Sequence, residues 1–162
     1  MNSKGLSLVE LLIAMSIIVI IGLLIVPNLL NYRRAQDLDF DAKAIVAALR
    51  DAQQRAITQE DLAPGEQWGV RFDNTISGQH FYAVFKGTVY PGTTVLRKPL
   101  KSSIEFYSIP IPPHVFLENL TGLPVSVSSA SVTIRIKNAS CPSPECKTIN
   151  INSNGTFIIT IE

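Results

Sequence analysis

Hydrophobic and polar positions follow three successive patterns along the chain, and the first is a long apolar run. A short polar segment, Met1–Gly5, leads into this run, which extends over Leu6–Val26. A helix rises about 1.5 Å per residue, and crossing the hydrocarbon core of a bilayer takes about 20 residues. The run therefore predicts a membrane-spanning helix over residues 6–27.

The second pattern is a helical stripe in an otherwise polar stretch. Apolar residues recur at alternating spacings of four and three, which is typical of an amphipathic helix. The stripe consists of Leu38, Ala42, Ile45, Leu49, Ala52 and Ala56. Asp39–Lys43 and Asp51–Arg55 are acid-first pairs four residues apart, which support a helix. We expect this helix to cover residues 28–63 and to end at Pro64-Gly65, with the stripe packed on a sheet. A coiled-coil dimer through the same stripe is the alternative.

The third pattern is the alternation of apolar and polar residues that half-buried strands show. It predicts a hairpin from residues 68–72 and 79–86, with Phe81, Ala83 and Phe85 on one face. A second hairpin is predicted from residues 148–152 and 156–161. Further strands are expected at residues 132–136 and, between prolines, near 103–107 and 115–118. A helix followed by antiparallel strands predicts an α+β fold: a long N-terminal helix packed on a β-rich head, residues 64–162.

One acid, Glu10, interrupts the apolar run. An ionised side chain at the centre of a membrane helix costs roughly 2.5 to 3.5 kcal/mol, and less near an end. A plain single-pass anchor leaves this cost unexplained. A cleaved secretory signal would have a shorter apolar core and a small-residue cleavage site after it. We therefore interpret Glu10 as a group that requires a cationic partner.

The segment Gly5-Leu6-Ser7-Leu8-Val9-Glu10 resembles the processing site of type IV pilins and type II secretion pseudopilins. The resemblance implies that residues 1–5 are a leader and that a prepilin peptidase cuts between Gly5 and Leu6 and methylates Leu6. It also implies that Glu10 pairs with the N-terminal ammonium of a neighbouring subunit in a filament. Pro27 stands where the family commonly has a proline, whereas Leu6 replaces the usual phenylalanine.

The order of helix and strands is also similar to that of H-type minor pseudopilins and related minor pilins. The implied partners are other pilin or pseudopilin subunits, the prepilin peptidase, an inner-membrane assembly platform and, before assembly, the lipid bilayer. The implied location is the inner membrane, crossed once with a cytoplasmic N-terminus, and then a periplasmic or extracellular filament. The flanking charges do not favour this orientation, because Lys4 precedes the run while Arg33 and Arg34 follow it.

Charge and length limit the other functions. The 162 residues suit a single exported domain, and 14 basic against 13 acidic side chains leave a net charge of +1. Removal of residues 1–5 would delete Lys4 and balance the charges, so nothing favours general attraction to nucleic acid. A DNA-uptake pilin and a membrane-anchored binding domain that does not assemble remain as alternatives.

Two cysteines and two histidines are the remaining candidates for chemistry. Cys141 and Cys146 enclose a short loop, and in an exported head we expect a disulfide between them rather than a metal site. His80 and His114 have no acid or nucleophile at motif spacing, and no catalytic signature is present. The sequence therefore predicts a structural subunit rather than an enzyme, without catalytic residues, metal or cofactor.

Overall fold

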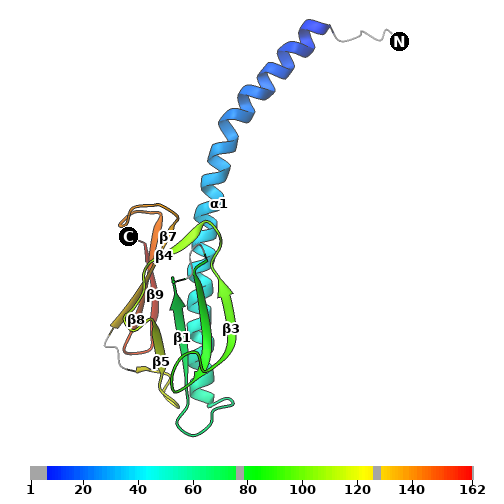
Figure 1. The fold of residues 1–162 in the computed structure, drawn as a ribbon. Coiled ribbons are helices and arrows are strands. Elements are labelled where there is room, and N and C mark those ends of the chain that lie inside the picture. The colour runs from blue at the N-terminus through cyan, green and yellow to red at the C-terminus, as the bar shows by residue number, and fades with distance from the viewer. Residues whose placement is uncertain (1–6, 76–78, 126–128, 162) are drawn as a thin grey trace. The chain divides into compact units, whose positions relative to one another are not determined.

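The structure is a computed structural model that describes residues 7–75, 79–125 and 129–161. One helix, α1 (Leu8–Thr58), comes first and is 51 residues long. The chain divides after Arg34 into an N-terminal unit and a second unit, here called the head, which begins at Ala35. The head therefore contains the second half of α1 together with all of the strands (Figure 1).

Two antiparallel sheets make up the rest of the head. The first has the order β3-β2-β1-β5-β6 and the second β4-β7-β8-β9. In the first sheet the strands are β1 (Gln67–Asp73), β2 (Phe81–Gly87), β3 (Thr93–Pro99), β5 (His114–Leu117) and β6 (Pro124–Val125). In the second they are β4 (Ile104–Ser108), β7 (Ser129–Ile136), β8 (Cys146–Asn152) and β9 (Phe157–Ile161). The predicted α+β class, with a long N-terminal helix packed on antiparallel sheets, is confirmed.

The head is built around the predicted stripe of α1. All six stripe residues are buried, at 1% exposed or less, in one core with side chains from both sheets. Three of these positions are alanine, and because their side chains are small, the sheets can approach the helix closely. Both predicted ion pairs are present, Asp39–Lys43 at 2.6 Å and Asp51–Arg55 at 3.0 Å. Because the stripe is covered within the molecule, the alternative prediction of a coiled-coil dimer through it is wrong.

The predicted hairpins are confirmed, with one difference in burial. β1 pairs with β2, and β8 pairs with β9. In β2, however, residues on both faces are buried, and it is Tyr82 and Val84 that join the core beside α1. Phe85 lies on the opposite face of β2. Its ring contacts the rings of Tyr90 and Phe116 at centroid distances of 5.2 and 5.4 Å, so aromatic side chains cover this face.

The end of α1 and two of the strands differ from the prediction. α1 ends at Thr58, before the predicted Pro64-Gly65, because Gln59 and Asp61 turn the backbone to positive φ. β4 and β5 lie where short strands were expected. β3 and β6 were not predicted, because β3 is an edge strand with largely exposed side chains and β6 has two residues.

Candidate assembly surface on the N-terminal helix

Glu10 lies in the first turn of α1, where Leu11 N donates a hydrogen bond to Ser7 O at 3.1 Å. A carboxylate there is favoured by the partial positive charge at a helix N-terminus. Its side chain is exposed, and no hydrogen bond or ion pair within the described residues involves it. The charge is therefore available to a group from outside the molecule.

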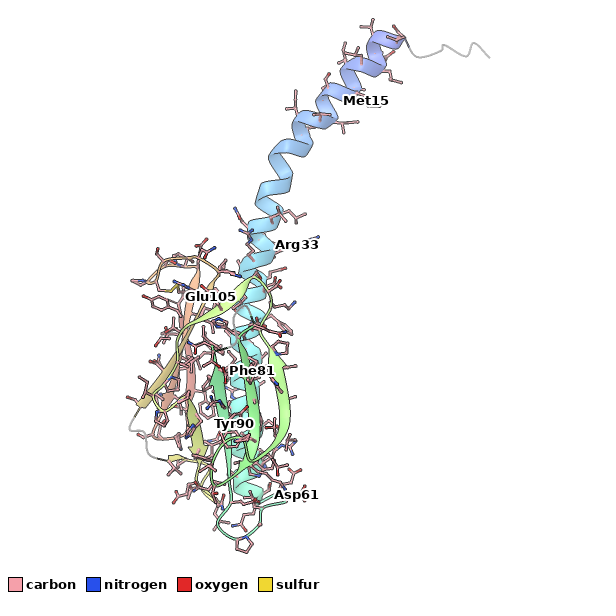
Figure 2. The ribbon with its side chains drawn as sticks, viewed as in Figure 1. Met15, Arg33, Asp61, Phe81, Tyr90 and Glu105 are labelled. Atoms are coloured by element: carbon pink, nitrogen blue, oxygen red, sulfur yellow. A yellow bond between two sulfur atoms is a disulfide. The ribbon has the colours of Figure 1, made fainter. Side chains whose placement is uncertain are left out.

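The side chains around Glu10 are apolar on every side of the helix. Eleven large apolar residues between Leu8 and Ile21 are 50 to 80% exposed. They are Leu8, Val9, Leu11, Leu12, Ile13, Met15, Ile17, Ile18, Val19, Ile20 and Ile21. Met15, for example, projects outward from α1 (Figure 2). A helix that is apolar all round is stable where its whole circumference is covered by lipid or protein.

Ser16, the other polar side chain in this stretch, is satisfied within the helix. Its hydroxyl lies 3.0 Å from Leu12 O and 2.8 Å from Ile13 O. Such back-bonding lets a hydroxyl enter an apolar environment without losing a hydrogen bond. Of the polar side chains between Leu8 and Ile21, Glu10 is thus the one without a partner.

Three other predicted features of this region stand as follows. Gly5 and Leu6, the predicted cleavage pair, lie outside the described residues. α1 continues as helix through Pro27, so the missing N–H donor of the proline does not interrupt it. Among the described residues, no helix combines the length and hydropathy of a membrane span.

Where α1 enters the head, three of its aspartates contact Lys101, in the connection between β3 and β4, and Lys147, on β8. The Asp41 carboxylate accepts a hydrogen bond from Lys101 N at 2.8 Å, and Asp37 forms an ion pair with the Lys101 ammonium at 3.2 Å. Asp39 contacts the Lys147 ammonium on β8. These contacts were not predicted, because a run of alternating acids on a helix resembles a solvated surface.

The aspartates have different electrostatic surroundings. Burial raises the pKa of Asp41 above its ordinary value of 3.8, against the opposing hydrogen bond from Lys101 N. Hydrogen bonds from Lys147 and Lys43 lower the pKa of Asp39. Asp41 in turn faces Tyr82, and burial followed by the Asp41 charge raises the pKa of that phenol to about 12. This junction therefore adds polar contacts to the otherwise apolar packing of α1 in the head.

At the far end of α1, Gln53 holds two turns of the head. Its amide nitrogen donates to Gly122 O and to Gly155 O, both at 3.2 Å. Gly155 has a φ of +77°, and a Cβ there would lie 2.7 Å from the Gln53 amide. Only glycine fits position 155 without strain, because a side chain there would need a positive φ and would collide with Gln53.

The disulfide and the histidines occupy structural positions. Cys141 and Cys146 are joined in a disulfide, as predicted. His80 Nδ1 accepts a hydrogen bond from Phe106 N at 2.8 Å, and the ring of His114 packs on Phe116 at 5.1 Å. Burial, with a smaller effect of the Arg71 charge, lowers the pKa of His114. No cluster of metal-ligating side chains occurs in residues 7–75, 79–125 and 129–161.

The basic side chains of the head are mostly paired. Arg135 bonds to Glu105 at 2.7 Å, Lys101 and Lys147 bond to aspartates of α1, and Arg97 covers the Phe81 ring at 3.9 Å. Neutralised and scattered charges of this kind do not build the continuous basic surface that binds a phosphate backbone. They do not favour the DNA-uptake alternative.

Comparison with known proteins adds two similarities. Residues 1–26 match the family model described as the prokaryotic N-terminal methylation motif. Among solved structures, the chain is similar to the minor pseudopilin EpsH from the type 2 secretion system of Vibrio cholerae. That similarity has a TM-score of 0.49 and 16% sequence identity, and covers 77% of this chain and 97% of the EpsH chain. No curated protein sequence matches the chain.

Proposed function

We propose that this chain, whose methylation motif supports its assignment to the type IV pilins and pseudopilins, is a structural subunit of a pilus or secretion filament. One observation carries the proposal: Glu10 is an unpartnered carboxylate on a helix that is otherwise apolar around its circumference. Packing against the helices of sister subunits would cover the apolar surface, and a cation from one of them would neutralise the acid.

The cation proposed is the N-terminal ammonium of an adjacent subunit. A prepilin peptidase would create it by cutting between Gly5 and Leu6 and would then methylate Leu6, which keeps the nitrogen cationic. An unpaired carboxylate buried among helices is strongly destabilising, whereas a paired one is compensated. Pairing with Glu10 therefore favours one axial register of neighbouring helices over slipped ones.

The remaining steps follow from where this helix is stable. Before assembly, residues 6–27 would cross the inner membrane once with the N-terminus in the cytoplasm, covered by lipid. An assembly platform in that membrane would transfer the subunit to a filament in the periplasm or outside the cell. Pro27 removes one N–H donor from α1, so the helix can extend or bend there during transfer. The head, whose strands and loops are joined to its part of α1 by the aspartates and Gln53, would lie at the filament surface.

The test replaces Glu10 and measures incorporation into filaments. Glu10→Gln keeps the shape of the side chain but not its charge, and Glu10→Ala removes both. We expect each variant to enter sheared filaments about tenfold less than the wild type, which corresponds to roughly 1.4 kcal/mol of lost pairing. Glu145→Gln, an exposed acid of the head, is the matched control.

Two results would contradict the proposal. Normal incorporation of Glu10→Gln would show that the charge does not set the register. Mass spectrometry of the protein from its native cells should find a chain that starts at methylated Leu6. A chain that still begins at Met1 would instead indicate a membrane-anchored domain that does not assemble.

A further inference from the structure

β9 is an edge strand of the head, and the backbone groups of alternate residues in it face away from the sheet. Asn152 N donates to Thr156 O at 3.0 Å, which makes these two residues a hydrogen-bonded pair. Hydrogen-bonded and non-hydrogen-bonded pairs alternate along an antiparallel ladder. Continuing the register, Ile151–Phe157, Ile149–Ile159 and Lys147–Ile161 are non-hydrogen-bonded pairs. The N–H and C=O groups of Phe157, Ile159 and Ile161 therefore point to the free edge.

These groups have no partner in the described part of the chain. None of the backbone hydrogen bonds formed outside the sheet ladders there involves Phe157, Ile159 or Ile161. Two of the strand's apolar side chains are also exposed, Ile158 at 51% and Ile161 at 69%. The strand thus presents both backbone groups and apolar surface.

The other edges of the two sheets are protected in ways that β9 is not. Exposed edges are usually blunted by charges, prolines, bulges or short length. β3 carries Arg97, Lys98 and Pro99, and β6 has only two residues, one of them proline. β4 contains Glu105 and a register irregularity. β9 (Phe157–Ile161) has neither charge nor proline, and its register with β8 is regular.

A groove of about 610 Å³ adjoins this edge, between β9 and the second half of α1. Val46 and Ala47 of the helix and Phe157, Ile158 and Ile159 of the strand line it. Lys43 and Arg50 complete the lining. Arg50 is exposed and forms no ion pair within the described residues, so the groove combines an apolar base with positive charge.

We propose that the β9 edge and this groove bind an extended peptide segment of a partner protein. The segment would add a strand beside β9, with its backbone paired to Phe157, Ile159 and Ile161. Apolar side chains on its inner face would cover Val46 and Ala47, and an acidic side chain would meet the unpaired Arg50. Main-chain pairing supplies affinity and the groove supplies selectivity, as in other cases of strand addition.

A second copy of β9 fits less well than an acidic partner. Self-pairing would bring two copies of the unpaired Arg50 to one interface, and like charges at an interface oppose binding. The proposal concerns the head alone and holds whether or not the chain enters a filament.

The experiment uses the full-length protein in detergent micelles and two labelled peptides of alternating valine and threonine. One peptide ends in glutamate at both termini and the other in lysine. We expect the glutamate peptide to bind more tightly and to slow amide hydrogen exchange at Phe157, Ile159 and Ile161. Arg50→Glu should weaken its binding about fivefold, whereas Lys98→Glu, which reverses an exposed charge on β3, should not.

A second variant tests the backbone pairing. Ile161→Pro removes an N–H that points to the free edge and leaves the ladder with β8 complete. This variant should bind the glutamate peptide more weakly, while its thermal unfolding temperature should stay close to that of the wild type. Peptide binding without slower exchange at the three amides, or equal binding by Arg50→Glu and Lys98→Glu, would overturn the proposal. Slow exchange of the same amides without peptide would show that a second copy already occupies the edge, and would overturn it too.

Discussion

At the scale of single residues, the polar junction between α1 and the sheets depends on burial. Asp41 is 4% exposed, and its carboxylate accepts the backbone N–H of Lys101. Tyr82 is 2% exposed beside it. Buried polar groups of this kind are stable in one protonation state, because charging them in the core without a compensating partner is costly.

The phenol of Tyr82 should make the head sensitive to alkali. Its pKa rises from 10.0 in the unfolded chain to about 12 in the fold. The stabilisation is therefore complete below pH 10 and is lost as the pH rises toward 12, by roughly 1.4 kcal/mol per pH unit. Tyr82→Phe should flatten this decline in a denaturation series between those pH values.

Tyr107→Phe is the matched control for this prediction. Its ring is 51% exposed, so replacing it should leave the alkaline decline as in the wild type. Equal declines in the wild type and in Tyr82→Phe would show that another group is responsible.

At the scale of elements, the two parts of α1 have different surfaces. From Leu8 to Ile21 it is apolar on all sides, which suits burial among other helices or in lipid. From Leu38 onward it exposes charges and buries one face, the stripe together with Val46 and Ala48. The sheets need that stripe, because each of them has an apolar face to cover.

The stripe should therefore carry much of the stability of the head. Leu49 is fully buried, and Leu49→Ala removes a side chain around which the core cannot close completely. We expect a loss of about 2 to 5 kcal/mol in the free energy of unfolding, measured by chemical denaturation of the full-length protein. Ile57→Ala, on the same helix but 41% exposed, should cost much less. Similar losses for the two variants would contradict the assigned core.

At the scale of the whole molecule, the two proposed functions belong to different units: filament assembly to the N-terminal unit and peptide binding to the head. The first unit presents an apolar surface with one unpaired acid, and the head holds the sheets, the disulfide and the β9 groove. The Glu10 side chain forms no hydrogen bond or ion pair within the described residues. Assembly and the stability of the head should therefore respond to different substitutions.

This separation is testable with the variants already described. Glu10→Gln should lower incorporation into filaments and leave the thermal unfolding temperature of the head unchanged. Leu49→Ala should lower that temperature, while the molecules that remain folded incorporate normally. A fall in the unfolding temperature with Glu10→Gln would show that the acid also supports the head, and would contradict the division.

The sequence by itself determined the features whose physical cause is local. An apolar helical run, a stripe at helical spacing and alternating strand residues each follow from the geometry of one element. The pairing of Cys141 with Cys146 was predictable for the same reason, because only a short loop separates them. The motif around Gly5 and Leu6 is local as well, and its cleavage stays a prediction.

Only the tertiary structure decided what depends on residues far apart in the chain. Asp41 and Lys101 are 60 positions apart, and Gln53 and Gly155 are 102 apart, so no local pattern marks either contact. Burial of both faces of β2 and the open edge of β9 likewise depend on which elements become neighbours. Sequence periodicity indicates which side of an element is exposed to solvent. The contact partners of a residue and the free edges of a sheet depend instead on how the elements pack together.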